Sequence, residues 1–147
     1  METDTGCPGS QRTRLLVVSP DENDSLSVRT LVTTGDWTIV RAAGLADAIQ
    51  SAHADDPDVV LAERQLSDGT WTDLLEFFNS RDNPPPLIVL SRFVDDRLWV
   101  EVLNLGGFDV LAKPLERSEA SRVLAMARLR GRMHRGGDQA RASATGV

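Results

Sequence analysis

The sequence predicts an α/β fold in which a parallel sheet of five strands is covered by helices on both faces. Three observations lead to this prediction. Short apolar blocks flanked by turn-forming residues alternate with segments of helical periodicity. The apolar blocks show no polar alternation, as expected for strands that are buried on both faces. A chain of 147 residues with 41% hydrophobic residues fits one domain with one core.

Five apolar blocks predict the strands of this sheet. Three of them are four residues long, at 15–18, 59–62 and 87–90, and consist entirely of Leu, Ile, Val and Ala. Two shorter blocks of the same kind lie at 38–40 and 110–112. Parallel strands that alternate with helices are joined by right-handed crossovers, which gives a (βα)5 arrangement.

The segments between and after the strands predict five helices, at 24–34, 45–54, 72–80, 95–105 and 116–133. Asp24 is the expected N-cap of the first helix, and Pro57 stops the chain from continuing the second. The apolar residues expected on buried faces are Leu26, Leu31 and Val32 in the first helix, Leu74, Leu75, Phe77 and Phe78 in the third, Leu98, Val102 and Leu105 in the fourth, and Val123, Leu124, Met126 and Ala127 in the last.

The two ends of the chain lack this patterning. Residues 1–12 and 134–147 are rich in small and charged residues without periodicity, so we expect flexible tails on either side of a domain at 13–133. The formal charge of −6 divides unevenly. Residues 128–147 carry five arginines against one aspartate, whereas the first 127 residues carry 11 basic and 21 acidic side chains.

Composition excludes several kinds of protein. No apolar run approaches the roughly 18 residues of a membrane span, and the N-terminus lacks a signal pattern. We therefore expect a soluble, cytoplasmic protein with no membrane partner. A single cysteine, Cys7, rules out an internal disulfide or a multi-cysteine metal site, and two histidines are too few for a His-rich centre.

Polar side chains follow the predicted strands at their carboxyl ends, where open α/β sheets form their sites. Ser19 and Pro20 follow the first strand, Glu63 the third, Ser91 the fourth, and the pair Lys113-Pro114 the fifth. An acid, a hydroxyl and a lysine from three separate strands are thus expected to converge.

This constellation resembles the receiver domain of two-component response regulators, over about residues 13–130. The segment PDVVLAERQLSDGTW is similar to the family's third strand and the loop after it, and FDVLAKPL resembles its fifth-strand Lys-Pro signature. The resemblance implies a flavodoxin-like sheet with strand order 2-1-3-4-5 and a cis Lys113–Pro114 bond. Family receivers take a phosphoryl group from a histidine kinase onto an aspartate, with Mg²⁺ held by that aspartate and an acidic pair.

The resemblance also shows where this chain departs from its family. Glu63 stands at the phosphoacceptor position, and Ser19 and Pro20 stand at the positions of the acidic pair. Proline has no carboxylate, and serine is a poor ligand for a hard cation. Val110 replaces the aromatic switch residue.

Three positions keep the family's residues. Ser91 and Lys113 match the groups that bind the phosphoryl oxygens, and Pro114 completes the signature.

Counting charges decides the expected metal content. A family site with three carboxylates and one lysine attracts a divalent cation, whereas Glu63 and Lys113 alone sum to zero. We therefore expect no cofactor and no Mg²⁺, and a site closed by a Glu63–Lys113 interaction or by a bridging water. The alternative is that Asp21 or Asp24 turns in to restore a metal ligand.

Glu63 itself has two interpretations. It either mimics a phosphoryl charge and holds an active-like state, or it simply satisfies Lys113. Both interpretations predict an atypical stand-alone receiver that is not an enzyme and that works by protein–protein interaction without phosphorylation. The alternatives are a phosphorylatable receiver with unusual ligands, and a nucleic-acid-associated regulator that uses the Arg-rich C-terminus.

A partner surface is predicted on the fourth helix. Trp99 and Leu103 lie one turn apart and outside the buried stripe of that helix, and Trp is favoured at interface centres. By resemblance, the fourth helix, fifth strand and fifth helix form the output and dimer face. We expect a histidine kinase, another regulator or a second copy there, and no binding of nucleic acid.

Overall fold

The computed structural model describes residues 12–32 and 36–145, with side chains as far as residue 131. The N-terminal tail predicted at 1–12 lies almost entirely outside the described residues. The elements in chain order are β1 (Thr13–Val18), α1 (Glu22–Leu31), β2 (Trp37–Ala42), α2 (Leu45–Ala54), β3 (Val59–Glu63), β4 (Gln65–Leu66), β5 (Gly69–Thr70), α3 (Trp71–Asn79), β6 (Leu87–Ser91), α4 (Asp96–Leu105), β7 (Asp109–Ala112) and α5 (Arg117–Thr145).

Five of the strands form one parallel sheet in the order β2-β1-β3-β6-β7. This order confirms the predicted 2-1-3-4-5 arrangement. The remaining strands, β4 and β5, pair with each other as a short antiparallel hairpin between β3 and α3, which the sequence patterns did not predict.

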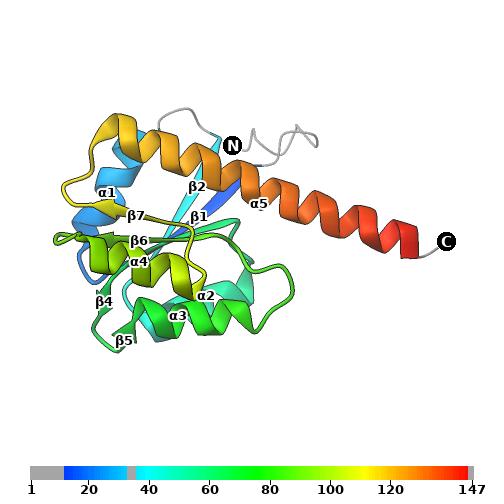
Figure 1. Ribbon diagram of the computed structural model, residues 1–147, viewed down its shortest axis with the longest axis horizontal. Helices are drawn as coiled ribbons and strands as arrows, with labels where there is room; N and C mark the ends of the chain where they lie inside the picture. The colour runs from blue at the N-terminus through cyan, green and yellow to red at the C-terminus, as the bar shows by residue number, and fades with distance from the viewer. Residues whose placement is uncertain (1–11, 33–35, 146–147) are drawn as a thin grey trace.

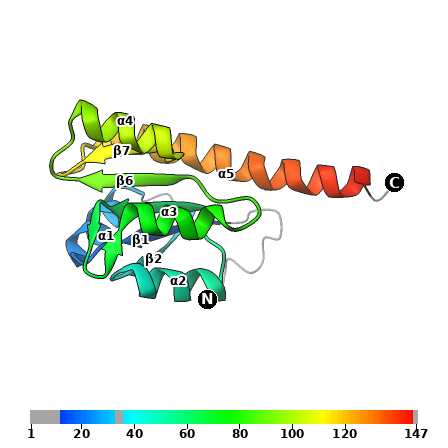
Figure 2. The same cartoon turned by 60° about the horizontal axis from the view of Figure 1, so that its bottom comes forward.

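Helices cover the sheet on both faces (Figures 1 and 2). The alternation of side chains along β1 shows how this divides the core. Leu16 and Val18 pack with α2, α3 and α4 on one face, whereas Leu15 and Val17 pack with α1 and α5 on the other. Strands buried on both faces explain why their sequences are continuous apolar runs.

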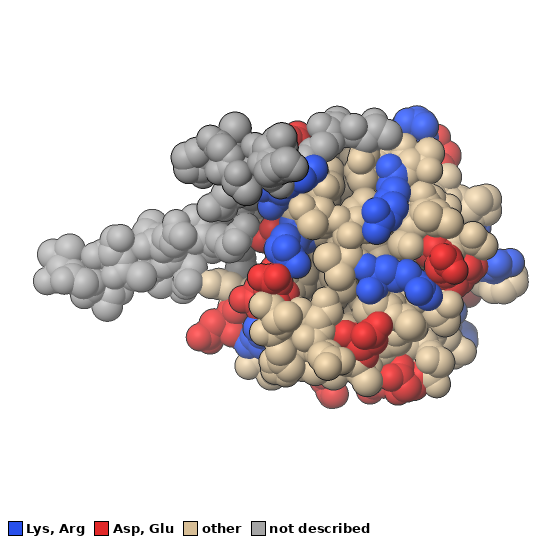
Figure 3. Space-filling model, turned by 180° about the vertical axis from the view of Figure 1, so that it is seen from behind, with Lys and Arg blue, Asp and Glu red and all other residues tan. Residues whose placement is uncertain are grey.

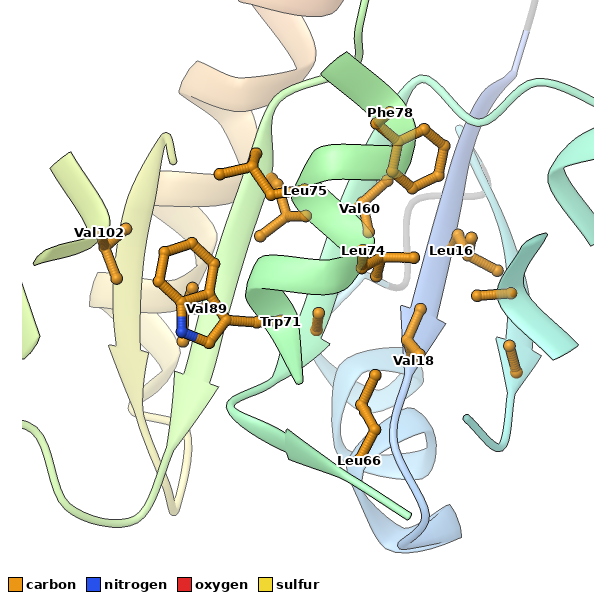
Figure 4. Close-up of a cluster of buried hydrophobic side chains, with 14 of the residues drawn as sticks. Leu16, Val18, Val60, Leu66, Trp71, Leu74, Leu75, Phe78, Val89 and Val102 are labelled. Carbon is orange, nitrogen blue, oxygen red and sulfur yellow. The ribbon is translucent and has the colours of Figure 1, made fainter. Parts of the chain in front are cut away.

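Trp71, at the first position of α3, belongs to the core. It is 2% exposed, and its indole extends from α3 toward Val102 of α4 within one cluster of buried side chains (Figure 4). The tryptophan thus fills space between α3 and α4.

The predicted start of α1 and the predicted burial of Leu26 are wrong. The N-cap is Asp21, whose side chain accepts a hydrogen bond from the backbone N–H of Asn23, and Asp24 lies inside the helix. Leu26 is half exposed, and the buried side chains of α1 are Asp24, Ser25 and Val28. Leu31 and Val32, which were also predicted to be buried, are partly buried and pack against the core.

Two further residues that were predicted to be buried lie at the surface. Leu105 at the end of α4 and Met126 in α5 are each about half exposed, while their neighbours Leu98, Val102, Val123, Leu124 and Ala127 are buried as predicted. Leu105 ends its helix beside Gly106, which has a positive φ of 104° and turns the chain away.

The last helix is longer than predicted. α5 continues to Thr145 instead of ending at 133, so the segment 134–145 is helical in the structure and not an irregular tail (Figure 1). Ala and Arg dominate its last residues, and both are good helix formers. Although α5 has 29 residues, it carries charges at short intervals, and no helix among the described residues is suited to cross a membrane.

Gly131 allows α5 to approach the sheet closely. A Cβ atom added there would lie 2.8 Å from the carbonyl oxygen of Asp58, directly before β3. Only a residue without a side chain fits this contact between backbones.

Candidate functional site

The site predicted from the strand ends is centred on Lys113, which directly follows β7. Its ammonium Nζ lies 3.1 Å from Oδ2 of Asp24 and forms a second ion pair with Oε1 of Glu63, the last residue of β3. The three side chains are 13%, 8% and 16% exposed, respectively. A lysine between two largely buried carboxylates is much less screened by water than a surface ion pair.

The Glu63–Lys113 ion pair was predicted, and the structure contains it. The predicted charge balance of the site is wrong, however, because Asp24 contributes a second carboxylate from α1. Two carboxylates and one ammonium sum to −1 rather than zero. Asp21 does not enter the site, since its side chain caps α1.

Ser19 holds Asp24 in place. The Ser19 hydroxyl donates a hydrogen bond of 2.6 Å to Oδ2 of Asp24 and accepts one of 3.0 Å from the backbone N–H of Asp21. Ser19 is 1% exposed, so this hydroxyl joins the end of β1 to the first turn of α1 inside the protein. The carboxylate oxygen of Asp24 consequently has two partners, Ser19 and Lys113.

The surroundings of Lys113 act on its pKa in opposite directions. Burial disfavours the charged ammonium and is the largest single influence, but the contacts with Glu63 and Asp24 together exceed it. The pKa of Lys113 is therefore raised above its ordinary value. Lysine 113 is fully charged at neutral pH, and both ion pairs are in place there.

Pro20 leaves its position without a side-chain ligand, and an arginine takes up the backbone next to it. Nη2 of Arg41, near the end of β2, donates to the carbonyl oxygens of Ser19 and Pro20, both at 3.2 Å. This guanidinium fixes the loop after β1 and adds a positive charge beside the positions of the family's acidic pair. No pattern in the sequence predicted this contact.

Ser91 lies at the end of β6 but does not join the network around Lys113. Its buried hydroxyl accepts a hydrogen bond from the backbone N–H of Phe93 and donates to the carbonyl of the same residue, both at 3.2 Å. Val110 is 3% exposed and packs in the core beneath the site. The Lys113–Pro114 peptide bond is cis, which confirms the prediction.

The side chains of the site do not fit Mg²⁺ in this arrangement. Magnesium requires oxygen ligands in near-octahedral geometry, but the inward oxygens of Asp24 and Glu63 both contact the ammonium of Lys113. Within the described residues, no group of three or more His, Cys, Asp or Glu side chains could hold a metal ion. A metal could use these two carboxylates only if Lys113 moved away.

Another carboxylate connects the β4–β5 turn to α2. Asp68, in the β4–β5 turn, accepts hydrogen bonds from the backbone N–H groups of Leu45 at 2.7 Å and Ala46 at 3.0 Å. These bonds satisfy the N-terminus of α2 and lower the pKa of Asp68. The β3–α3 connection is thereby tied to α2, although the two are more than 20 residues apart in the sequence.

Large apolar side chains are exposed on α4 and α5 among charged and polar ones. Trp99 and Leu103 are 41% and 47% exposed, which agrees with their predicted position outside the buried stripe of α4. Val100 on the same helix and Met126 and Leu129 on α5 are also more than half exposed. We call these five residues the α4–α5 surface.

Two arginines near the C-terminus contact aromatic rings of the domain. The guanidinium of Arg128 lies 5.8 Å from the ring centroid of Trp37 and 3.8 Å from a carboxylate oxygen of Asp36, and that of Arg130 lies 5.6 Å from the centroid of Phe108. These two arginines therefore attach α5 to the sheet, a role that the sequence interpretation overlooked.

Acidic and basic side chains are interspersed over the described part of the face shown in Figure 3, so charges of one sign are not gathered there.

Comparison with known proteins gives the same family as the resemblance found in the sequence. Residues 15–125 match the response regulator receiver domain. The Acid tolerance regulatory protein ActR of Rhizobium meliloti (strain 1021) is 26% identical over 102 residues, which are 69% of this chain and 53% of that protein. The chain spans about half the length of the curated relatives it matches.

Solved structures share the fold. A two-component response regulator from Clostridium difficile superposes with a TM-score of 0.70 at 24% identity, covering 81% of this chain and 97% of that one. The signal receiver domain of an HD domain-containing protein from Pseudomonas fluorescens Pf-5 gives a TM-score of 0.78 at 21% identity, with coverage of 88% and 96%. With a family match over most of its length, this chain belongs to the response regulator receiver domains of two-component signalling.

Proposed function

We propose that this chain is an atypical receiver that signals by binding a protein partner, without phosphorylation and without Mg²⁺. One observation carries the proposal: Lys113 is ion-paired with both carboxylates of the site, Asp24 and Glu63. Receiver domains in two-component systems interact with kinases and other signalling proteins, so a receiver of this kind would keep the binding function of its family.

The chemistry of phosphoryl transfer supports this proposal. The carboxylate at the acceptor position must be free to attack phosphorus, and a metal ion must neutralise the charge of the transferred group. In this chain, the Glu63 carboxylate is held in an ion pair with Lys113. The positions of the metal-binding pair hold Ser19, which is bonded to Asp24, and Pro20, which has no ligand atom in its side chain.

Intact-mass analysis tests the chemistry directly. We expect no mass increase when the protein is incubated with a small-molecule phosphodonor and Mg²⁺. The triple variant Ser19→Asp, Pro20→Asp, Glu63→Asp restores the carboxylates of the family and serves as the positive control. Phosphorylation of the unaltered chain at Glu63 would contradict the proposal and support a phosphorylatable receiver with unusual ligands.

The partner is proposed to bind at the α4–α5 surface. Trp99 and Leu103 are large, exposed apolar side chains on this surface, and interface energy concentrates in residues of this kind. A kinase, a second regulator or a second copy of this chain would cover them. The exposed apolar residues distinguish this surface from the rim of the site, where polar groups find partners within the chain.

Capture of partners from the native cell tests this surface, with Trp99→Arg as the disrupting variant and Leu26→Arg as the matched control. Leu26 is also a half-exposed apolar residue, but it lies on α1. We expect the Trp99 variant alone to lose its partner. Light scattering of the same proteins tests for a homodimer, and equal capture by both variants would contradict the proposed surface.

A further inference from the structure

We propose that the ammonium of Lys113 is a built-in cation that occupies the place of a divalent metal ion between Asp24 and Glu63. This inference rests on the proposed metal-independent function and deepens it. It assigns to one covalently attached group the neutralising role that a dissociable ion would otherwise have. Its consequence is that removal of the ammonium should convert the site into one that binds a divalent cation.

The geometry places the ammonium where a cation is needed. Oδ2 of Asp24 and Oε1 of Glu63 come from different elements, α1 and β3, and both contact the same nitrogen atom. Ser19 fixes the direction of the Asp24 carboxylate through its hydroxyl. Two carboxylates that converge on one point and are held by further hydrogen bonds have the donor chemistry that Mg²⁺ and Ca²⁺ prefer.

The burial of these carboxylates means that water cannot replace the lysine. Asp55 and Asp56 form ion pairs with Arg14 and Arg81, but their side chains are 64% and 74% exposed. Loss of either arginine would leave a solvated carboxylate, at little cost. Loss of the Lys113 charge would leave two largely buried carboxylates close together, a state that repulsion and desolvation both disfavour.

Two ways of relieving this repulsion are available to a variant such as Lys113→Met. One carboxylate can take up a proton, or a divalent cation can enter and bind both. Because the remaining ligands would be water and the Ser19 hydroxyl, we expect weak binding, with a Kd on the order of 1 mM. Ca²⁺ tolerates irregular geometry better than Mg²⁺, so it should bind at least as well.

The experiment compares the full chain with Lys113→Met and with the double variant Lys113→Met, Asp24→Asn. Calorimetry and thermal unfolding are recorded with Mg²⁺ and with Ca²⁺ at millimolar concentrations, and K⁺ at equal ionic strength is the control. We expect a saturable rise in Tm for Lys113→Met alone. The unaltered chain has its cation in place, and the double variant has only one carboxylate left.

The possible outcomes separate this inference from the proposed function. Saturable Mg²⁺ binding by the unaltered chain would overturn both. No binding by a folded Lys113→Met protein would overturn the built-in cation alone and leave the metal-independent function intact. Should Lys113→Met be unfolded without metal, refolding by Ca²⁺ or Mg²⁺ supports the inference. Failure of both ions to refold it, while the double variant folds, overturns the inference.

Discussion

The site at the strand ends and the α4–α5 surface are built on opposite principles. At the site, buried charged groups find their partners within the chain: Lys113 binds Asp24 and Glu63, and Ser19 binds Asp24. On the α4–α5 surface, large apolar side chains such as Trp99 and Leu103 are exposed to solvent. The difference teaches that polar groups in the region that performs chemistry in the family are satisfied within the chain here, whereas on the outer surface large apolar side chains are left in contact with solvent.

Lys113→Met is the change expected to disturb the site most. It leaves Asp24 and Glu63 buried without a counter-ion, so the free energy of unfolding at pH 7 should fall by about 3 kcal/mol. Chemical denaturation measures this loss. The double variant with Asp24→Asn should recover part of it, because one of the two repelling charges is removed. Equal stability of Lys113→Met and the unaltered chain would show that the ion pairs contribute nothing to folding.

Ser19→Ala is expected to have a smaller effect at the same place. It removes the hydrogen bond to Asp24 and the one from the backbone of Asp21, and should cost about 1–2 kcal/mol. Ser25→Ala is the matched control, since Ser25 is also buried but its hydroxyl donates only to the carbonyl of Glu22 within α1. A similar loss in both variants would show that the effect belongs to α1 in general.

Alkaline pH should weaken the site gradually. The pKa of Lys113 is higher in the folded chain than in the unfolded chain, where it is about 10.4. The contribution of Lys113 to the free energy of unfolding is therefore complete below the unfolded pKa and is lost as the pH rises through the folded pKa. The stability difference between the unaltered chain and Lys113→Met should therefore be constant from pH 7 to about 10 and should shrink above it. Lys113 is the only lysine and the chain has no tyrosine, so few other groups titrate there. A difference that begins to shrink near pH 8 would contradict the raised pKa.

Trp99→Arg should have the smallest effect on folding. The side chain is partly exposed, and a surface substitution of this kind changes the free energy of unfolding by about 0.5 kcal/mol or less. Chemical denaturation and partner capture are measured on the same preparation, and we expect partner capture to be lost while the free energy of unfolding stays nearly unchanged. A large loss of stability would place Trp99 in the core and remove it from the proposed surface.

Local sequence patterns were sufficient for most of the fold. The apolar blocks at 15–18, 59–62 and 87–90 all lie within observed strands, and the helix at 45–54 was predicted with its observed bounds. Such patterns succeed because burial on two faces demands an unbroken apolar run. The end of α5 was mispredicted, because residues 134–145 lack the apolar periodicity from which helices were predicted, although Ala and Arg among them are good helix formers.

Asp24 shows why the site could be predicted only in part. Its spacing from Val28 and Leu31 is that of one helix face, so the sequence contained the signal. With Asp24 taken as the N-cap, its entry into the site was expected only as an alternative and as a metal ligand, not as a partner of Lys113. The contact of Arg41 with the loop after β1 offers no comparable pattern, because a guanidinium from β2 and two backbone carbonyl groups of this loop carry no periodicity.

The sequence by itself determined the fold class, the strand order implied by the family resemblance, and the Glu63–Lys113 pair, because each depends on local patterning or on the meeting of parallel strand ends at one edge. Only the tertiary structure decided that Asp24 joins this pair and that the site carries a charge of −1. Those facts depend on the rotation of α1 against the sheet, which is set by side-chain packing across the core and not by any single segment.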